Sequence, residues 1–360
     1  MKIIYACLVL LGILSCKQLE KQSIKTIKVD PNKSDQIGIS KIASRIDKII
    51  LQTNDSCLIT RIQEIKKTTH YIFINDAGQR ILQFDSFGNF IKQIGKGGRG
   101  PGEYLGINSF TLDSINQTIY VSSLRNIICF DYFGNPIREI RQESFSESMN
   151  VIGDELWTIS TSYGNKQNGL TFFNITKLVR YTLQGNPVDT IIIKKVSLPG
   201  LSGTINPSAN YISDLGYIRY LYFPVLILEP IQIVRDTIYE VKSDKIIPSL
   251  KLDFGKDAIP ENGRIPIRIN CIYLTGKYLF IEYTRSREKF LLCFNLKNND
   301  YYNMPEGFID DYYNTGYTWL KPLDLKKGIL YFSKDAFMIY DKIEGISENS
   351  NPILFIVSLK

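Results

Sequence analysis

Two stretches of this chain repeat one another, and the repeat constrains the fold more than any other feature. FINDAGQRILQFDSFGNFIKQI (residues 73–94) aligns with YVSSLRNIICFDYFGNPIREI (residues 120–140). In both, an apolar segment ends in Phe-Asp, at Phe84-Asp85 and 46 positions later at Phe130-Asp131, and the turn Phe-Gly-Asn follows. Apolar residues alternate with period two between regularly spaced turns, which predicts consecutive antiparallel strands.

Fainter copies of this unit continue toward the C-terminus, at residues 155–193, 217–255 and 268–296 and from Trp319 onward. A period in the forties with four strands per unit predicts the blades of a β-propeller. The abundance of tyrosine (22) and phenylalanine (19) also favours strands. We therefore predict an all-β, six-bladed propeller of four-stranded antiparallel blades over residues 41–360. An N-terminal strand at Ile46–Gln52 is expected to pair beside the C-terminal strand and close the ring. Segment 334–345 is compatible with a short helix or a strand.

The first unit and its Gly-rich crossing resemble the NHL-type repeat, through the core R-I-x-x-F-D-x-x-G-x-F. The whole chain is similar to the six-bladed β-propeller lipoproteins of Gram-negative bacteria. Their recurring crossing, central DTIY and C-terminal NP with an apolar strand correspond here to Gly98–Tyr104, Asp236–Tyr239 and Asn351–Leu359. The proline that usually follows the crossing in NHL repeats is missing from EYLGINSFTLD. The resemblance implies a propeller held at the bacterial envelope.

The N-terminus, MKIIYACLVLLGILSC, is typical of a lipoprotein signal. Lys2 precedes an apolar run from Ile3 to Leu14 that is too short to span a bilayer. We predict a signal peptide at residues 1–15, lipidation of Cys16 and a flexible tether at residues 16–40. The alternative is a plain signal peptide with an incidental cysteine. The predicted location is the bacterial cell envelope, with the outer membrane favoured and the leaflet left open.

Four cysteines remain after residue 16, and none forms a C-x-x-C pair. Because they lie in apolar, strand-like segments, we expect Cys57, Cys129, Cys271 and Cys293 to be buried free thiols rather than a disulfide framework.

The loop IGKGGRGPGEY contains Gly95, Gly97 and Gly100 in the spacing G-x-G-x-x-G. A dinucleotide-binding loop must open a helix, but a strand-like segment follows here. We therefore expect the glycines to serve a tight crossing between two blades. Arg99 and Glu103 are expected either to form a structural ion pair or to point toward the central funnel, where they would be ligand-binding candidates.

Composition and single residues exclude several kinds of chemistry. His70 is the only histidine, and no nucleophile motif accompanies it, so a histidine-dependent triad or zinc site is not expected. A cofactor is not predicted, although calcium bound by oxygen ligands stays open. The net charge of +7 is spread along the chain, which argues against a nucleic-acid interface.

One segment, residues 298–319, is dense enough in aromatic and acidic residues to suggest a site. Aromatic faces beside carboxylates suit saccharide or peptide recognition. The alternative is that the tyrosines pack between blades, and adjacent Asp side chains on a strand point apart. The ligand-binding candidates are Asp310, Asp311, Tyr312, Tyr313, Tyr317 and Trp319.

These observations favour a non-catalytic, lipid-anchored binding or scaffold module of the envelope that recognises a protein, peptide or glycan on one propeller face. The alternative is a propeller hydrolase or lyase acting on sugar derivatives, with calcium as an optional cofactor. A third interpretation is a purely structural spacer.

Overall fold

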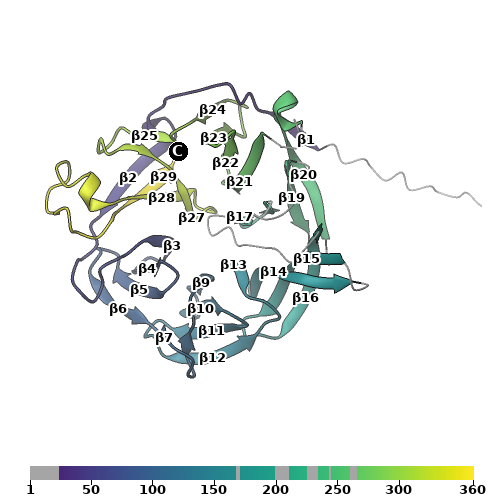
Figure 1. Cartoon of the computed structure of the whole chain (residues 1–360). Helices are drawn as coiled ribbons and strands as arrows, with labels where there is room; N and C mark the ends of the chain where they lie inside the picture. Colours follow the sequence, from purple (N-terminus) through teal and green to yellow (C-terminus); the bar gives the residue numbers. More distant parts are fainter. Residues whose placement is uncertain (1–23, 168–170, 199–210, 225–233, 243–244, 260–265) are drawn as a thin grey trace, which may run out of the picture.

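Each repeat of the sequence folds into one four-stranded antiparallel sheet, and six such sheets stand in a ring (Figure 1). The computed structural model describes residues 24–167, 171–198, 211–224, 234–242, 245–259 and 266–360. Within these residues the only helices are three short 3-10 turns, η1 (Ile39–Lys41), η2 (Gly255–Ala258) and η3 (Ala336–Met338). The predicted all-β, six-bladed propeller is confirmed. Segment 334–345, for which helix and strand were both open, contains η3 and turns.

The first strand of each blade lies near the centre of the ring and the fourth lies at the rim (Figure 1). Blade 1 comprises β3 (Ile62–Lys67), β4 (Tyr71–Asp76), β5 (Arg80–Asp85) and β6 (Phe90–Ile94). Blade 2 comprises β9 (Ser109–Asp113), β10 (Thr118–Ser123), β11 (Asn126–Asp131) and β12 (Pro136–Arg141). Blade 3 comprises β13 (Ser146–Ile152), β14 (Glu155–Gln167), β15 (Thr171–Thr182) and β16 (Pro187–Leu198).

The second half of the ring repeats this arrangement. Blade 4 comprises β17 (Ile212–Asp214), β18 (Arg219–Leu221), β19 (Thr237–Lys242) and β20 (Lys245–Asp253). Blade 5 comprises β21 (Ile267–Leu274), β22 (Tyr278–Arg285), β23 (Glu288–Asn295) and β24 (Tyr301–Met304). Blade 6 comprises β27 (Lys321–Asp324), β28 (Ile329–Lys334), β29 (Ile353–Leu359) and β2 (Ala43–Ile49).

Blade 6 closes the ring with strands from both ends of the chain. The N-terminal β2 pairs antiparallel with the C-terminal β29, and Ile46 lies opposite Val357. This pairing covers the outer edge of β29, and β2 becomes the rim strand of the blade. The predicted closure is confirmed, with the strand spanning Ala43–Ile49 rather than residues 46–52.

The predicted flexible tether at residues 16–40 is wrong from Ile24 onward. Strand β1 (Lys25–Lys28) pairs in parallel with β20, the rim strand of blade 4. Ile27 and Val29 are buried in the apolar cluster between blades 4 and 5, and this burial outweighs the polar character of the flanking lysines. The predicted signal peptide and Cys16 lie outside the described residues.

Apolar side chains fill the spaces between neighbouring blades. Between blades 5 and 6, Phe280, Phe332 and Phe355 belong to one buried cluster, and the rings of Phe332 and Phe355 stack with centroids 4.6 Å apart. The expected buried free cysteines are confirmed, because all four belong to the buried set and none is in a disulfide.

The ring has two faces that differ in their connections. We call the hairpin face the one that carries the turns joining the first to the second strand of each blade. The opposite, crossing face carries the connections between blades, including the short parallel pair β7 (Lys96–Gly97) and β8 (Glu103–Tyr104).

The glycine loop lies in this crossing between blades 1 and 2, and strand β9 follows it. Gly95 has φ +63°, and a Cβ there would stand 2.7 Å from the Tyr104 ring. The Tyr104 hydroxyl donates a hydrogen bond to the Ile94 carbonyl oxygen at 2.8 Å. The glycine therefore serves close passage of the chain, as the sequence predicted.

Candidate functional site

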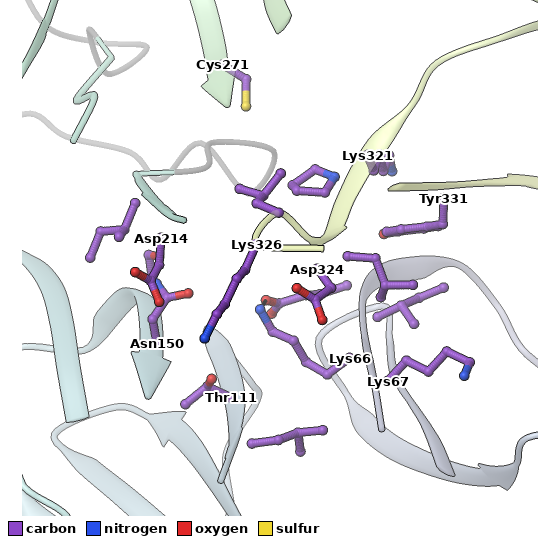
Figure 2. Close-up of a pocket in the computed structure, with 18 of the residues that line it drawn as sticks. Lys66, Lys67, Thr111, Asn150, Asp214, Cys271, Lys321, Asp324, Lys326 and Tyr331 are labelled. Carbon is purple, nitrogen blue, oxygen red and sulfur yellow. Dashed lines mark ion pairs between the residues drawn. The ribbon is translucent and has the colours of Figure 1, made fainter. Parts of the chain in front are cut away.

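The first strands of the six blades surround a central channel with a volume of about 1030 Å³ (Figure 2). Strands β3, β9, β13, β17, β21 and β27 all contribute lining residues, and blade 5 adds residues from its second and third strands. A concave space at the axis of the ring is the default ligand site of such an architecture. What this channel can bind depends on which of its polar groups already have partners within the protein.

Most carboxylates of the channel have partners within the protein. Glu64 pairs with Lys66 at 2.9 Å, and Glu147 accepts a hydrogen bond from the Tyr163 hydroxyl at 3.0 Å. Asp214 accepts the Gly216 N–H at 3.1 Å. These acids hold the channel wall together.

Two more carboxylates stabilise turns at the mouth of the channel on the hairpin face. Asp113 accepts hydrogen bonds from the backbone N–H and the side-chain amide of Asn116, at 3.0 and 2.6 Å. Asp324 accepts the Lys327 N–H at 3.1 Å and pairs with the Lys327 ammonium at 3.0 Å. Each fixes a turn between the first and second strands of its blade.

Glu282, on β22, differs from the other acids because no hydrogen bond or ion pair engages its carboxyl group among the described residues. Burial raises its pKa from 4.5 to about 7, while the nearby Lys321 and Lys289 act in the opposite direction. Burial also raises the pKa of the neighbouring Tyr331 hydroxyl. At neutral pH, Glu282 is therefore divided between its protonated and ionised forms.

Four lysines of the channel have no carboxylate partner within 4.0 Å in the part of the chain that is described: Lys67, Lys289, Lys321 and Lys326. The Lys67 ammonium donates to the Thr68 carbonyl oxygen at 3.2 Å. In Figure 2 the Lys326 side chain extends from blade 6 into the pocket, toward the side lined by Asn150 and Asp214. A channel whose acids are engaged and whose lysines are available offers a positive potential to a ligand.

The predicted site residues Asp310 and Asp311 face the fold rather than the channel. They lie at the end of the hairpin β25 (Phe308–Asp310) and β26 (Gly316–Thr318). Asp310 is buried and accepts the Thr315 hydroxyl at 2.5 Å. Asp311 accepts the Ser40 N–H at 3.0 Å. Both carboxylates thus stabilise the hairpin and its contact with the N-terminal segment.

The predicted tyrosines of this hairpin are also used by the fold. Tyr312 and Tyr313 donate hydrogen bonds to the carbonyl oxygens of Ala43 and Ile46, at 3.3 and 3.2 Å. Both acceptors belong to β2, the rim strand of blade 6. The hairpin therefore lies beside blade 6 rather than over the channel (Figure 1).

Of the aromatic candidates, only Trp319 lines the channel. Tyr317 is partly exposed, and its carbonyl oxygen accepts a hydrogen bond from the Lys334 ammonium. The density of aromatic and acidic residues in this segment was a misleading signal. Closeness along the chain does not determine which side chains of a hairpin reach the axis of the ring.

The predicted pair of Arg99 and Glu103 does not form. Glu103 instead pairs with Lys96 at 2.9 Å and accepts the Gly100 N–H at 2.8 Å. These contacts hold the pKa of Glu103 below its usual range, with the Gly100 hydrogen bond the larger cause. Neither Arg99 nor Glu103 lines the channel.

The channel lysines and Glu282 were not among the residues predicted from the sequence. Lys321 immediately follows the aromatic segment, but which residues face the axis depends on which strand of each blade is innermost. A usable signal existed in the alternation of charged and apolar residues along the first strands, as in Glu64, Ile65 and Lys66.

No cluster of three or more His, Cys, Asp or Glu side chains that could hold a metal ion is present among the described residues. His70 is exposed in the turn between β3 and β4, where its N–H donates to the Thr68 hydroxyl at 3.3 Å. In the same described part, no helix is both long and apolar enough to cross a bilayer.

Comparison with known proteins agrees with the fold. No curated protein matches the chain. A crystal structure from Bacteroides fragilis NCTC 9343 named "Putative exported protein" aligns with a TM-score of 0.68 and 20% identity, over 94% of this chain and 100% of that chain. The WD40 repeats of RRP9 align with a TM-score of 0.45 and 11% identity, over 91% and 99% of the two chains. The model of the family described as "Domain of unknown function (DUF4934)" matches residues 24–358, and the chain therefore belongs to that family.

Proposed function

We propose that this protein is a lipid-anchored, non-catalytic binding or scaffold module of the bacterial envelope, and that its protein, peptide or glycan ligand places an acidic group in the central channel. The observation that carries the proposal is the imbalance of available charge in that channel. Its carboxylates are engaged within the fold except Glu282, whereas four lysines have no carboxylate partner among the described residues: Lys67, Lys289, Lys321 and Lys326.

The envelope location is supported by the sequence of the N-terminus and by one relative. Residues 1–16 have the charged start, the apolar run and the final cysteine of a lipoprotein signal. The name of the Bacteroides fragilis relative includes the word exported. Acyl chains on Cys16 would anchor the propeller to a membrane, with the outer membrane favoured.

Binding of anionic polymers tests the channel directly. The full-length lipoprotein in detergent is titrated with poly-glutamate and with polygalacturonate, and with neutral dextran as a reference, by calorimetry. We expect the two acidic polymers to bind and dextran not to bind. The double variant Lys321→Ala/Lys326→Ala should lose most of this affinity.

The matched control removes two positive charges far from the channel, in Lys256→Ala/Lys297→Ala; both lysines are exposed on the surface. This control should bind as the unsubstituted protein does. Equal affinity of the two double variants, or no binding of either acidic polymer, would count against the channel as an anion site.

A second candidate function, a hydrolase or lyase acting on sugar derivatives, is favoured by Glu282. A carboxyl group with a pKa of about 7 is suited to general acid–base catalysis at neutral pH. The test is release of reducing ends or unsaturated products from polygalacturonate, with and without calcium. Turnover that Glu282→Gln abolishes and His70→Ala leaves unchanged would establish the enzyme, and binding without turnover would support the module.

A further inference from the structure

The two tryptophans of the chain have different surroundings. The Trp157 indole N–H donates to the Glu155 carboxylate at 2.8 Å. The guanidinium groups of Arg180 and Arg219 also lie over its ring, each 5.6 Å from the ring centroid. Trp319 packs against the apolar cluster between blades 5 and 6 and also lines the channel. Among the described residues, no hydrogen bond, aromatic ring or cation engages its indole. Trp319 therefore keeps an apolar surface and a donor that the fold does not use.

Positive charge lies beside this indole. Trp319 and Lys321 both line the channel, whereas Leu320 between them is fully buried in the cluster between blades 5 and 6. Side chains two positions apart on one side of an extended segment are about 7 Å apart. Lys289, on the third strand of blade 5, lines the channel as well, and both lysines are close enough to Glu282 to act on the pKa of its carboxyl group. One part of the channel thus combines an aromatic surface with two ammonium groups.

The wall formed by blades 2 and 3 offers neutral polar groups. Thr111 on β9 and Ser148 and Asn150 on β13 line the channel. No hydrogen bond to another described residue engages these three side chains. In Figure 2, Thr111 and Asn150 lie across the pocket from Lys321. Because hydroxyl and amide groups both donate and accept hydrogen bonds, this wall suits a ligand rich in hydroxyl groups.

We propose that the acidic group bound in the channel is the carboxylate of a uronic acid in a glycan, with its sugar ring against Trp319 and its carboxylate between Lys289 and Lys321. The inference rests on the proposed function and names its ligand class. A uronic acid carries its carboxylate directly on the sugar ring, so that a flat C–H face and a negative charge lie side by side. An acidic peptide carries its carboxylates on flexible chains without such a face, and it would use the lysines but not the indole. The sugar hydroxyls bond to the neutral wall of blades 2 and 3.

The fluorescence of Trp319 reports on this contact directly. The full-length lipoprotein in detergent is titrated with polygalacturonate and with poly-glutamate, and both the affinity and the tryptophan emission are recorded. We expect polygalacturonate to bind with a change in emission and poly-glutamate to bind without one. Trp319→Phe, which keeps a flat ring, should retain binding of polygalacturonate and lose the emission change. Trp157→Phe is the matched control and should keep both.

A second variant, Trp319→Ala, removes the ring. It should weaken binding of polygalacturonate about tenfold and leave the affinity for poly-glutamate within about twofold. Equal effects on the two polymers, or binding of polygalacturonate by the unsubstituted protein without an emission change, would overturn the uronic acid and leave the channel as a general anion site. Tighter binding of poly-glutamate would make the ligand an acidic peptide. The emission change decides the question even if Trp319→Ala does not fold. Failure of the proposed function has a separate signature, because the unsubstituted protein would then bind neither acidic polymer.

Discussion

The side chain of Lys326 in blade 6 lies against Gly216 in blade 4, so that a Cβ on Gly216 would stand 2.8 Å from the Lys326 Cε atom. Two blades separated by a third are therefore in contact at the mouth of the channel on the hairpin face. Gly216 also has φ +85°, a conformation that L-residues adopt only at a cost.

We expect Gly216→Ala to lower the free energy of unfolding by about 1–2 kcal/mol, mainly through the left-handed backbone conformation. In the Lys326→Ala background the steric part of this loss should disappear, so the two substitutions should not be additive. Urea denaturation of the four proteins of this cycle measures the difference. An unchanged stability of Gly216→Ala would contradict the backbone argument, and strict additivity would contradict the contact with Lys326.

Glu282 should make the stability of the protein depend on pH. Its pKa is raised from 4.5 to about 7 in the folded state, so between these values the folded protein holds a proton that the unfolded chain has lost. Ionisation therefore lowers stability as pH rises through this window, by up to about 3 kcal/mol above pH 7. Glu282→Gln should be more stable than the unsubstituted protein at pH 8 and should lose this advantage at pH 4. Denaturation midpoints that move in parallel at both pH values would show that Glu282 titrates normally.

The blade repeat could be predicted because its signals are local, and the ring closure followed because the repeat left one N-terminal strand without a partner. Alternating apolar residues and Asp-x-Phe-Gly-Asn turns define strands without knowledge of distant contacts. Strand β1 could not be predicted in this way, because the three lysines in and around Lys25–Lys28 hide two buried side chains, Ile27 and Val29. Its burial depends on pairing with β20, more than 200 residues away in the chain.

The candidate site was less predictable than the fold. Tyr312 and Tyr313 stand out in the sequence, but their hydroxyls bond to the backbone of β2, which only the closed ring brings near them. Lys321 and Glu282 belong to different blades and become neighbours only at the axis. Site residues that come from separate blades leave no local pattern to read.

Asn351, the first residue of the C-terminal Asn-Pro pair, bonds to the chain segment between blade 6 and blade 1. This buried side chain accepts the Ile59 N–H at 2.7 Å and donates to the carbonyl oxygens of Gln52 and Cys57 at 2.7 and 2.9 Å. It thus fastens the last blade to the connection that leads into blade 1. We expect Asn351→Ala to cost about 3 kcal/mol or more of unfolding free energy, because several buried backbone groups lose their partners.

The control for this prediction is Asn349→Ala, which changes an exposed residue two positions earlier. It should alter stability by no more than about 0.5 kcal/mol. Chemical denaturation followed by tryptophan fluorescence compares the two variants. A similar, small effect of both substitutions would mean that the Asn351 bonds are replaced by water at little cost.

Thiol counting tests both the buried cysteines and the predicted lipid anchor. Cys57, Cys129, Cys271 and Cys293 are buried, and burial raises the pKa of the Cys129 thiol to about 11, so thiolate is scarce at pH 8. Native protein isolated from membranes should therefore react negligibly with a thiol-specific reagent, and unfolded protein should show four thiols per chain. A fifth thiol after unfolding would be Cys16 without lipid. That result would contradict the predicted lipid anchor and would leave the prediction of four buried thiols unchanged. Fast reaction of the folded protein, lost in Cys271→Ser, would instead mean that the channel opens enough to admit the reagent to Cys271.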